Sequence, residues 1–148
     1  MFDKLNQLVR ENIKNEVFLN GGIHSDALES ASQEASGVIV DVLKTQLDRG
    51  KAVDLMSFFK GKKAESDVLL KMMVHKFANR LNNYYSISAA SAKEIAENII
   101  PKVMGIFVFQ TSQNKKSENE IFALLNWLSG YTVNFEKFFT KINGLQTA

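Results

Sequence analysis

The sequence contains no cysteine among its 148 residues. Disulfide bonds and thiolate metal ligands are therefore excluded, and with them the class of small secreted proteins that depend on disulfides. The longest apolar run, Val103–Phe109, has seven residues, whereas a membrane-spanning helix needs about 20. Asp3, Asn6 and Arg10 interrupt the first turns, which therefore lack the apolar stretch of a signal peptide. We expect a cytoplasmic protein with no membrane span.

Motifs that carry enzymatic chemistry are also missing. The sequence has no Gly-x-Ser-x-Gly, no P-loop, no Gly-x-Gly-x-x-Gly and no calcium loop. Its two histidines, His24 and His75, lie far apart without a His-Glu-x-x-His motif, which argues against a metal ligand or a general base. Glu94 and Glu97 share the polar side of a predicted helix, and a solvated surface explains them; a deep polar pocket around them or His75 would indicate an enzyme. We expect no enzymatic activity, no cofactor and no metal.

The apolar residues that are present recur at steps of three and four, which is typical of amphipathic helices. The central helix is predicted to begin at the cap Ser88 and to contain Pro101, where we expect a kink or a break. It continues through Val103–Phe109, which is apolar on nearly every face and has to be surrounded by other helices. These residues could form a buried strand, but no second strand is available to pair with them. We place the segment at the centre of an all-α core.

Turn and cap signals divide the rest of the chain into six further helices. The expected boundary residues, in chain order, are Asn20–Gly22, Ser25, Gly50, Gly61, Ser66, Tyr85, Gln110, Ser117, Gly130 and Gly144. Val53, Met56 and Phe59 are expected to face inward from a short helix. Ala31, Ala35 and Gly37, inside the second helix, are small and are expected to allow another helix to come close. The sequence therefore predicts one all-α domain, residues 1–148, built as a compact bundle of about seven helices.

An internal repeat is suggested by the order of helix lengths. Medium, long and short helices occur in residues 1–63 and again in 64–130, and a C-terminal helix follows in 131–148. The interior glycines Gly37 and Gly105 lie in the two long helices. A duplicated three-helix unit explains this order, but so does the alternation of helix lengths that any all-α protein shows.

Aromatic residues cluster near the C-terminus, and they predict an interface. Phe122, Trp127, Phe135, Phe138 and Phe139 lie within eighteen residues. Core packing accounts for most of them, but the helices that contain them have more apolar surface than a short C-terminal helix can cover. We interpret the excess as a seam for self-association or for a protein partner. Residues 1–48 carry a net charge of −4 and residues 49–148 one of +6; this asymmetry favours self-association or marks two solvated faces.

Nucleic-acid binding is the alternative function. Lys76, Asn79, Arg80 and Asn83 share one helix face, and basic and amide side chains of this kind contact base edges and phosphates. Against it, the whole chain has a net charge of only +2, and the loop before this helix does not resemble a helix-turn-helix connector.

Four segments resemble the bacterial YidB-like family, a domain of unknown function. They are Met1–Leu5 with Leu8 and Val9, Ala35–Ile39, Leu55–Gly61, and Ile99–Met104. The resemblance extends from Met1 to about Gly130, although this chain has fewer loop glycines and more lysine than the family. It implies a small all-α bacterial protein and supplies no catalytic or ligand-binding residues. The sequence thus favours a non-enzymatic protein that acts in protein–protein interaction or self-association.

Overall fold

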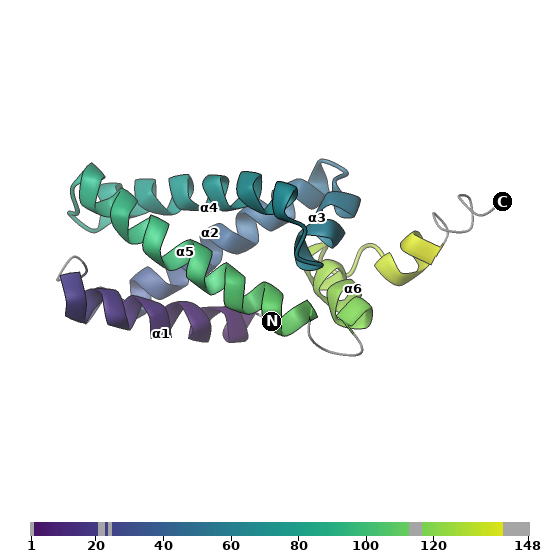
Figure 1. The fold of residues 1–148 in the computed structure, drawn as a ribbon, viewed down its shortest axis with the longest axis horizontal. Coiled ribbons are helices and arrows are strands. Elements are labelled where there is room, and N and C mark those ends of the chain that lie inside the picture. The colour runs from purple at the N-terminus through teal and green to yellow at the C-terminus, as the bar shows by residue number, and fades with distance from the viewer. Residues whose placement is uncertain (1, 21–22, 24, 113–116, 141–148) are drawn as a thin grey trace.

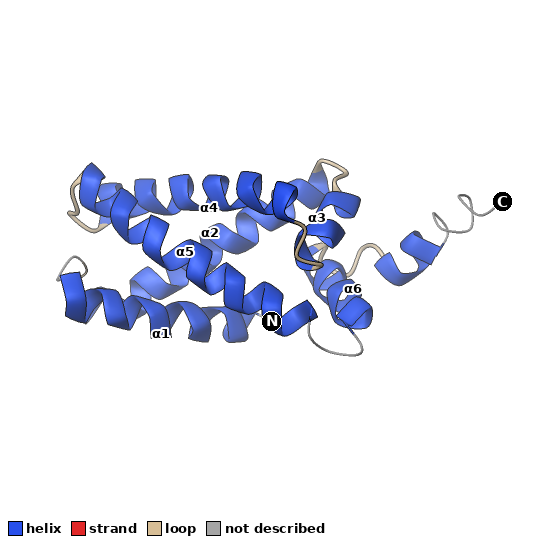
Figure 2. Cartoon of the chain, viewed as in Figure 1, coloured by secondary structure: helices blue, strands red, loops and turns tan. Residues whose placement is uncertain are grey.

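The described part of the protein is entirely helical in its regular secondary structure (Figure 2). The computed structural model describes residues 2–20, 23, 25–112 and 117–140, without the side chains of residues 15–20, 25, 63–65, 112, 117 and 118. The elements are α1 (Phe2–Asn20), the 3₁₀ turn η1 (Ser25–Ala27), α2 (Leu28–Asp48), α3 (Ala52–Phe59), α4 (Lys63–Tyr84), α5 (Ala89–Ser112) and α6 (Ser117–Leu128). Residues 135–140 are also helical. The predicted all-α bundle of about seven helices is confirmed.

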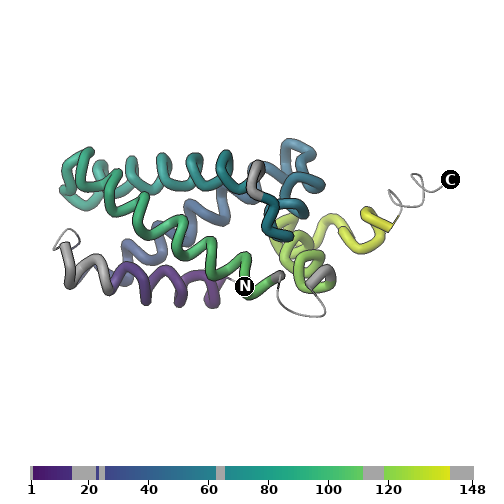
Figure 3. The backbone as a smooth tube through the Cα atoms, viewed as in Figure 1, coloured from purple at the N-terminus to yellow at the C-terminus, as the bar shows by residue number. Residues whose placement is uncertain are grey.

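Four long helices form a ring around the core. α1 packs against α2 and α5, and α4 packs against α5 and α2. In Figure 1, α1 and α4 therefore lie on opposite sides, and α2 and α5 cross between them on opposite faces. α3 and α6 contact each other and both crossing helices, so that they close one end of the ring. Residues 135–140 lie beyond α6 at this end, drawn in yellow in Figure 3.

Three helices end with the same glycine turn. Gly50, Gly61 and Gly130 have φ angles of +76°, +84° and +68°, which glycine adopts without the strain that other residues incur. In each turn the glycine N–H donates to the carbonyl three residues back, and the next N–H donates to the carbonyl five residues back, at 2.8–3.0 Å. This is the Schellman arrangement of a helix C-terminus. The predicted left-handed cap at Gly50 is confirmed.

Other predicted boundaries are confirmed in part. α1 ends at Asn20 and α4 at Tyr84, and Ser88 Oγ accepts a hydrogen bond from the Ser91 N–H at 3.2 Å. The cap at Ser66 is wrong, because α4 begins at Lys63 directly after the Gly61 turn, with Lys62 as an extended N-cap. The predicted start of the next loop at Gln110 is wrong as well, since α5 continues to Ser112; residues 113–116 of that loop lie outside the described residues.

Several boundary predictions lie outside the described residues. They are the side-chain caps at Ser25 and Ser117 and the helix end at Gly144.

Pro101 lies inside a helix that continues on both sides of it, so the break that the sequence allowed does not occur. The proline has no N–H to donate to the Glu97 carbonyl four residues earlier. Both residues are exposed, so the ring and the freed carbonyl lie at the solvent-facing side of α5. This position makes an interior proline compatible with the fold.

The segment predicted as the centre of the core is buried on one side only. Val103, Met104 and Phe107 are at most 2% exposed, and the Phe107 ring meets the Phe59 ring edge to face at 6.1 Å. Phe109, however, is 61% exposed. The prediction that the segment is covered on nearly every face is therefore wrong. The physical reason is that α5 belongs to the wall of the ring and keeps one face in solvent.

Two inward placements are also corrected. Val53 was expected to face the core, but it is 53% exposed on α3. Of the three small residues expected to allow a close helix approach, Ala31 and Ala35 are buried, but a Cβ atom added at Gly37 would meet no atom within 4 Å. Its position on the exposed face of α2 leaves nothing inside the molecule for it to accommodate.

The two halves of the chain place similar residues at corresponding positions. A shift of 64 residues relates α1 to α4, a shift of 61 relates α2 to α5, and a shift of 69 relates α3 to α6. Buried pairs that follow these shifts are Leu5/Leu69, Val9/Met73, Ile13/Phe77, Ala31/Ala92, Ala35/Ala96, Ile39/Ile100, Val42/Val103, Leu55/Leu124 and Met56/Leu125. The packing of α1 on α5 has its counterpart in the packing of α4 on α2.

This correspondence is the pattern that a duplicated three-helix unit would give. The interior glycines used in the sequence argument do not take part in it, because Gly105 is 68 residues after Gly37 rather than 61. The duplication of residues 1–63 and 64–130 stays a prediction.

Candidate functional site

Exposed apolar residues occur in α3 and in the segment that follows α6, at one end of the molecule. We define the C-terminal apolar surface by Val53, Tyr131, Val133 and Phe138, which are 53%, 74%, 40% and 39% exposed. These four are the majority of the seven large hydrophobic residues exposed in the described part of the chain; the others are Val68, Tyr84 and Phe109. A concentration of this kind is typical of an interaction site.

Ring contacts join this surface to the core. Phe138 lies edge to face with Phe135 and Phe139, with ring centroids 5.9 Å and 5.3 Å apart. Phe139 contacts Phe122 of α6 at 5.6 Å, and both residues line a hollow of about 430 Å³ that Val53 also lines. Phe138 is therefore backed by a cluster of aromatic rings that extends to α6.

Asn126 holds the turn that presents Tyr131 and Val133. Its backbone carbonyl accepts the Tyr131 N–H at 2.8 Å and the Ser129 hydroxyl at 2.8 Å. Its side-chain Oδ1 accepts the Phe135 N–H at 2.8 Å, so one residue fixes the end of α6 and the next helical segment. Tyr131 has a φ of +62°, a conformation that costs a non-glycine residue roughly 1–2 kcal/mol. The turn keeps a strained backbone and presents its tyrosine to solvent.

The five aromatic residues predicted as an interface divide into two groups. Phe135 and Phe139 are buried, at 5% and 9% exposure, while Phe122 and Trp127 are half-buried against the core. Phe138 is the member that faces solvent. The predicted interface included the exposed Phe138 and did not include the exposed Val53, Tyr131 and Val133. Tyr131 and Val133 could have been predicted to be exposed, because they are apolar residues in the turn that directly follows Gly130.

The residues predicted as a nucleic-acid face lie on α4, but acidic residues of α2 neutralise its cations. Lys76 Nζ lies 2.9 Å from Asp41 Oδ2, and Arg80 Nη1 lies 3.4 Å from Glu34 Oε1. The Arg80 guanidinium also lies 5.9 Å from the centre of an aromatic ring, that of Tyr84. The acidic first part of the chain thus neutralises basic residues of the second part within one molecule.

The other two residues predicted for this face, Asn79 and Asn83, are uncharged amides. Asn79 Nδ2 lies 3.4 Å from His75 Nε2, and Asn83 is exposed. The pairing of Lys76 with Asp41 and of Arg80 with Glu34 lowers the positive potential of this face, and proteins attract phosphate backbones through such potential.

The residues around which a polar pocket would indicate an enzyme are only partly brought together. His75 and Glu97 line the same groove between α4 and α5, with a volume of about 540 Å³, and Glu94 is not among its lining residues. The apolar residues that line the groove are Leu70, Val74, Ala78, Ala89 and Pro101, and its other lining residues are polar or charged. Within the described residues no three His, Asp or Glu side chains gather as a metal site, and His24 lies outside them.

Comparison with known proteins gives no match to a protein-family model, to a curated protein or to a solved structure. The resemblance to the YidB-like family therefore stays a prediction. No helix among the described residues has the length and hydropathy of a membrane span.

Proposed function

We propose that this protein is a non-enzymatic interaction module that self-associates through the C-terminal apolar surface. The observation that carries the proposal is the exposure of Tyr131 and Phe138 beside a turn that Asn126 holds by three hydrogen bonds. Aromatic side chains held in place before binding lose little conformational entropy when a partner covers them. Such residues are the usual anchors of protein interfaces.

The charges beside the surface favour a second copy of this chain as the partner. Glu136 and Lys137 are exposed and directly precede Phe138. In a dimer with two-fold symmetry the same patch faces itself, so Glu136 of each protomer can lie opposite Lys137 of the other. The surface is then complementary to itself in charge as well as in apolar character.

A matched pair of double variants tests the proposal. Tyr131→Asn with Phe138→Ser removes both aromatic anchors, and asparagine tolerates the positive φ at position 131. The control is Tyr84→Asn with Val68→Thr, because Tyr84 and Val68 are 68% and 61% exposed but lie on α4. Light scattering coupled to gel filtration should show an oligomer for the wild type and the control, and a monomer for the first variant.

Two results contradict self-association through this surface. One is a monomeric wild type at all concentrations examined. The other is an oligomer that the Tyr131 and Phe138 changes leave intact. Circular dichroism must show equal helix content in both variants, so that a loss of mass reports on the interface and not on folding.

We further propose that the chain is a bacterial, cytoplasmic member of the YidB-like family. The resembling segments support this, because they coincide with structural features of the fold. Leu55–Gly61 forms most of α3 and its glycine turn, and Ile99–Met104 contributes buried residues of α5.

A further inference from the structure

A hollow of about 430 Å³ adjoins the C-terminal apolar surface, and residues of α3, of α6 and of the helical segment 135–140 line it. These elements lie together at one end of the molecule in Figure 1. Val53 belongs both to the surface and to the lining of the hollow. A second copy that covers the surface therefore also covers part of the hollow.

The lining of this hollow combines aromatic rings with charges of both signs. Phe122 and Phe139, whose ring centroids are 5.6 Å apart, form its aromatic part. Lys60 and Lys62 contribute positive charge to the lining, and Glu136 contributes negative charge. Such a mixture does not select an ion of either sign. It suits a neutral side chain with an apolar ring and a hydroxyl that can both donate and accept a hydrogen bond, which is the phenol of tyrosine.

Tyr131 has the exposure and the fixed backbone that an anchor for such a hollow needs. It is 74% exposed, the highest value among the large hydrophobic residues exposed in the described part of the chain, and it does not line the hollow of its own molecule. Its φ of +62° strains a non-glycine residue, and hydrogen bonds to Asn126 hold the turn in this conformation. The fold thus directs the phenol outward before any partner binds, as is favourable for an interface anchor.

Two other exposed aromatic side chains have ring partners in their own chain. Phe138 lies edge to face with Phe135 and Phe139, and the Arg80 guanidinium lies 5.9 Å from the centre of the Tyr84 ring. Among the described residues, the Tyr131 ring has neither an aromatic nor a cationic partner of this kind. Tyr131 is therefore the exposed aromatic that gains most from a partner in a second copy.

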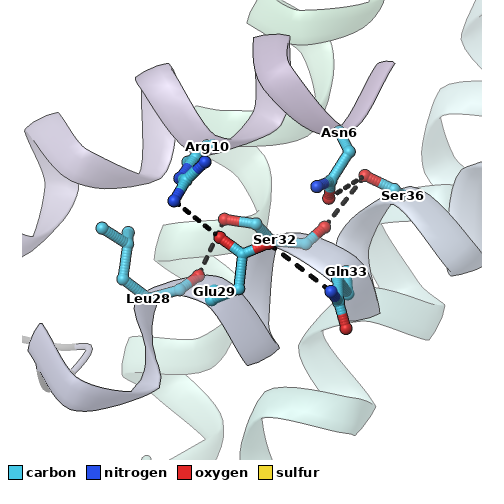
Figure 4. Close-up of polar contacts among 7 residues, drawn as sticks. All are labelled: Asn6, Arg10, Leu28, Glu29, Ser32, Gln33 and Ser36. Carbon is cyan, nitrogen blue, oxygen red and sulfur yellow. Dashed lines mark hydrogen bonds and ion pairs between the residues drawn. The ribbon is translucent and has the colours of Figure 1, made fainter. Parts of the chain in front are cut away.

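Polar surfaces elsewhere on the molecule are bridged by side chains of the same chain. Figure 4 shows this between α1 and α2, where Arg10 Nη2 lies 3.0 Å from Glu29 Oε2 and the Ser36 hydroxyl donates to Asn6 Oδ1 at 3.2 Å. The hollow between α2 and α4 is crossed in the same way by the two ion pairs described above. These contacts favour the hollow beside the C-terminal apolar surface as the place where a side chain of a second copy enters.

We propose that Tyr131 of each copy inserts into this hollow of the other copy when the protein dimerises. The inference rests on the proposed self-association and adds the side chain that anchors it and the site that receives this side chain. In a dimer with two-fold symmetry the contact forms twice, because each copy supplies one tyrosine and one hollow. The ring lies against Phe122 and Phe139, and the hydroxyl lies among Lys60, Lys62 and Glu136.

Two variants that each lack one half of the contact test the proposal by complementation. Tyr131→Asn removes the tyrosine and keeps the hollow. Asn119→Trp fills the hollow and keeps the tyrosine, because Asn119 is an exposed residue of the lining. Each variant alone should lose both contacts of the dimer. An equimolar mixture should dimerise, because the tyrosine of the Asn119→Trp copy can enter the hollow of the Tyr131→Asn copy.

Sedimentation equilibrium measures the expected changes in the dissociation constant of the dimer. Loss of one tyrosine anchor weakens an interface about 30-fold, so each variant alone should associate about 1,000-fold more weakly than the wild type, and the mixture about 30-fold more weakly. Tyr131→Phe keeps the ring but loses two hydroxyl contacts per dimer, and it should weaken association about tenfold. Ala90→Trp, at an exposed position of α5 outside the lining, should leave association unchanged.

The possible failures of the two proposals are distinguishable. A wild type that is monomeric at all concentrations contradicts the self-association itself. If the wild type dimerises, the inference is overturned when Asn119→Trp dimerises equally well, or when the mixture associates no better than the separate variants. Circular dichroism must show unchanged helix content in each variant. Should Asn119→Trp fail to fold, Tyr131→Phe still decides, because an unchanged dissociation constant would contradict the position of the hydroxyl.

Discussion

Replacement of Phe107 by alanine is the sharpest test of the placement of α5. The Phe107 side chain is 2% exposed, and its ring meets Phe59, which in turn meets Phe58 at 5.1 Å. Truncation of a buried phenylalanine lowers the free energy of unfolding by about 3–5 kcal/mol, through lost burial and the cavity that remains. An edge-to-face pair adds about 0.5–1.5 kcal/mol beyond burial. We expect Phe107→Ala to lower the free energy of unfolding by about 4 kcal/mol.

Urea denaturation followed by circular dichroism measures this loss. With an m-value of about 2 kcal/mol per molar urea, the midpoint should fall by about 2 M. Phe109→Ala is the matched control, because Phe109 lies two residues further along α5 and is 61% exposed; it should cost less than about 1 kcal/mol. Equal losses for the two variants, or a loss below about 1 kcal/mol for Phe107→Ala, would falsify the burial of this face of α5.

Two further predictions concern exposed positions. Gly37→Ala and Gly105→Ala should each raise the free energy of unfolding by up to about 1 kcal/mol, because both glycines lie in helix interiors where an added Cβ atom meets no neighbour. The midpoint of urea unfolding measures this change. Gly50→Ala should instead lower the free energy of unfolding, because Gly50 has a φ of +76°. A double-mutant cycle on Lys76 and Asp41 should give a coupling below about 1 kcal/mol that decreases with salt, since both side chains are about half exposed; a coupling above about 2 kcal/mol would contradict the open α2–α4 surface.

Much of the fold could be predicted from the sequence because local signals agreed with one another. Glycine at a helix end, as at Gly50, and serine at a helix start, as at Ser88, each satisfy backbone groups that the helix leaves unpaired. The predicted cap at Ser66 was wrong because α4 begins at Lys63, two residues after the turn at Gly61. A serine does not mark the start of a helix when the helix already begins at an earlier residue.

Exposure was harder to predict than helix position. A run of apolar residues indicates how much surface could be buried, but the number of neighbours depends on how distant helices pack. Val103–Phe109 lies in the wall of a ring of helices, so Phe109 faces solvent although its neighbours in sequence are apolar. The pairing of Lys76 with Asp41 could not be predicted from the sequence either, because the two residues are 35 positions apart.

The candidate site was predicted as a region and not residue by residue. Clustered aromatics near the C-terminus led to the predicted interface; of these residues Phe138 is exposed, whereas Phe135 and Phe139 are buried in the core. Tyr131 and Val133 entered the surface through a turn whose geometry depends on hydrogen bonds to Asn126. The spacing of apolar residues in helices does not predict a turn of this kind.

Sedimentation equilibrium of the wild-type protein across the micromolar range tests the central claim most directly. If the C-terminal apolar surface is covered by a second copy in solution, the average mass rises with concentration from 16.6 kDa toward a dimer. Because apolar contacts dominate the surface, the association should persist at high salt. A mass that stays at the monomer value over the whole range would contradict self-association.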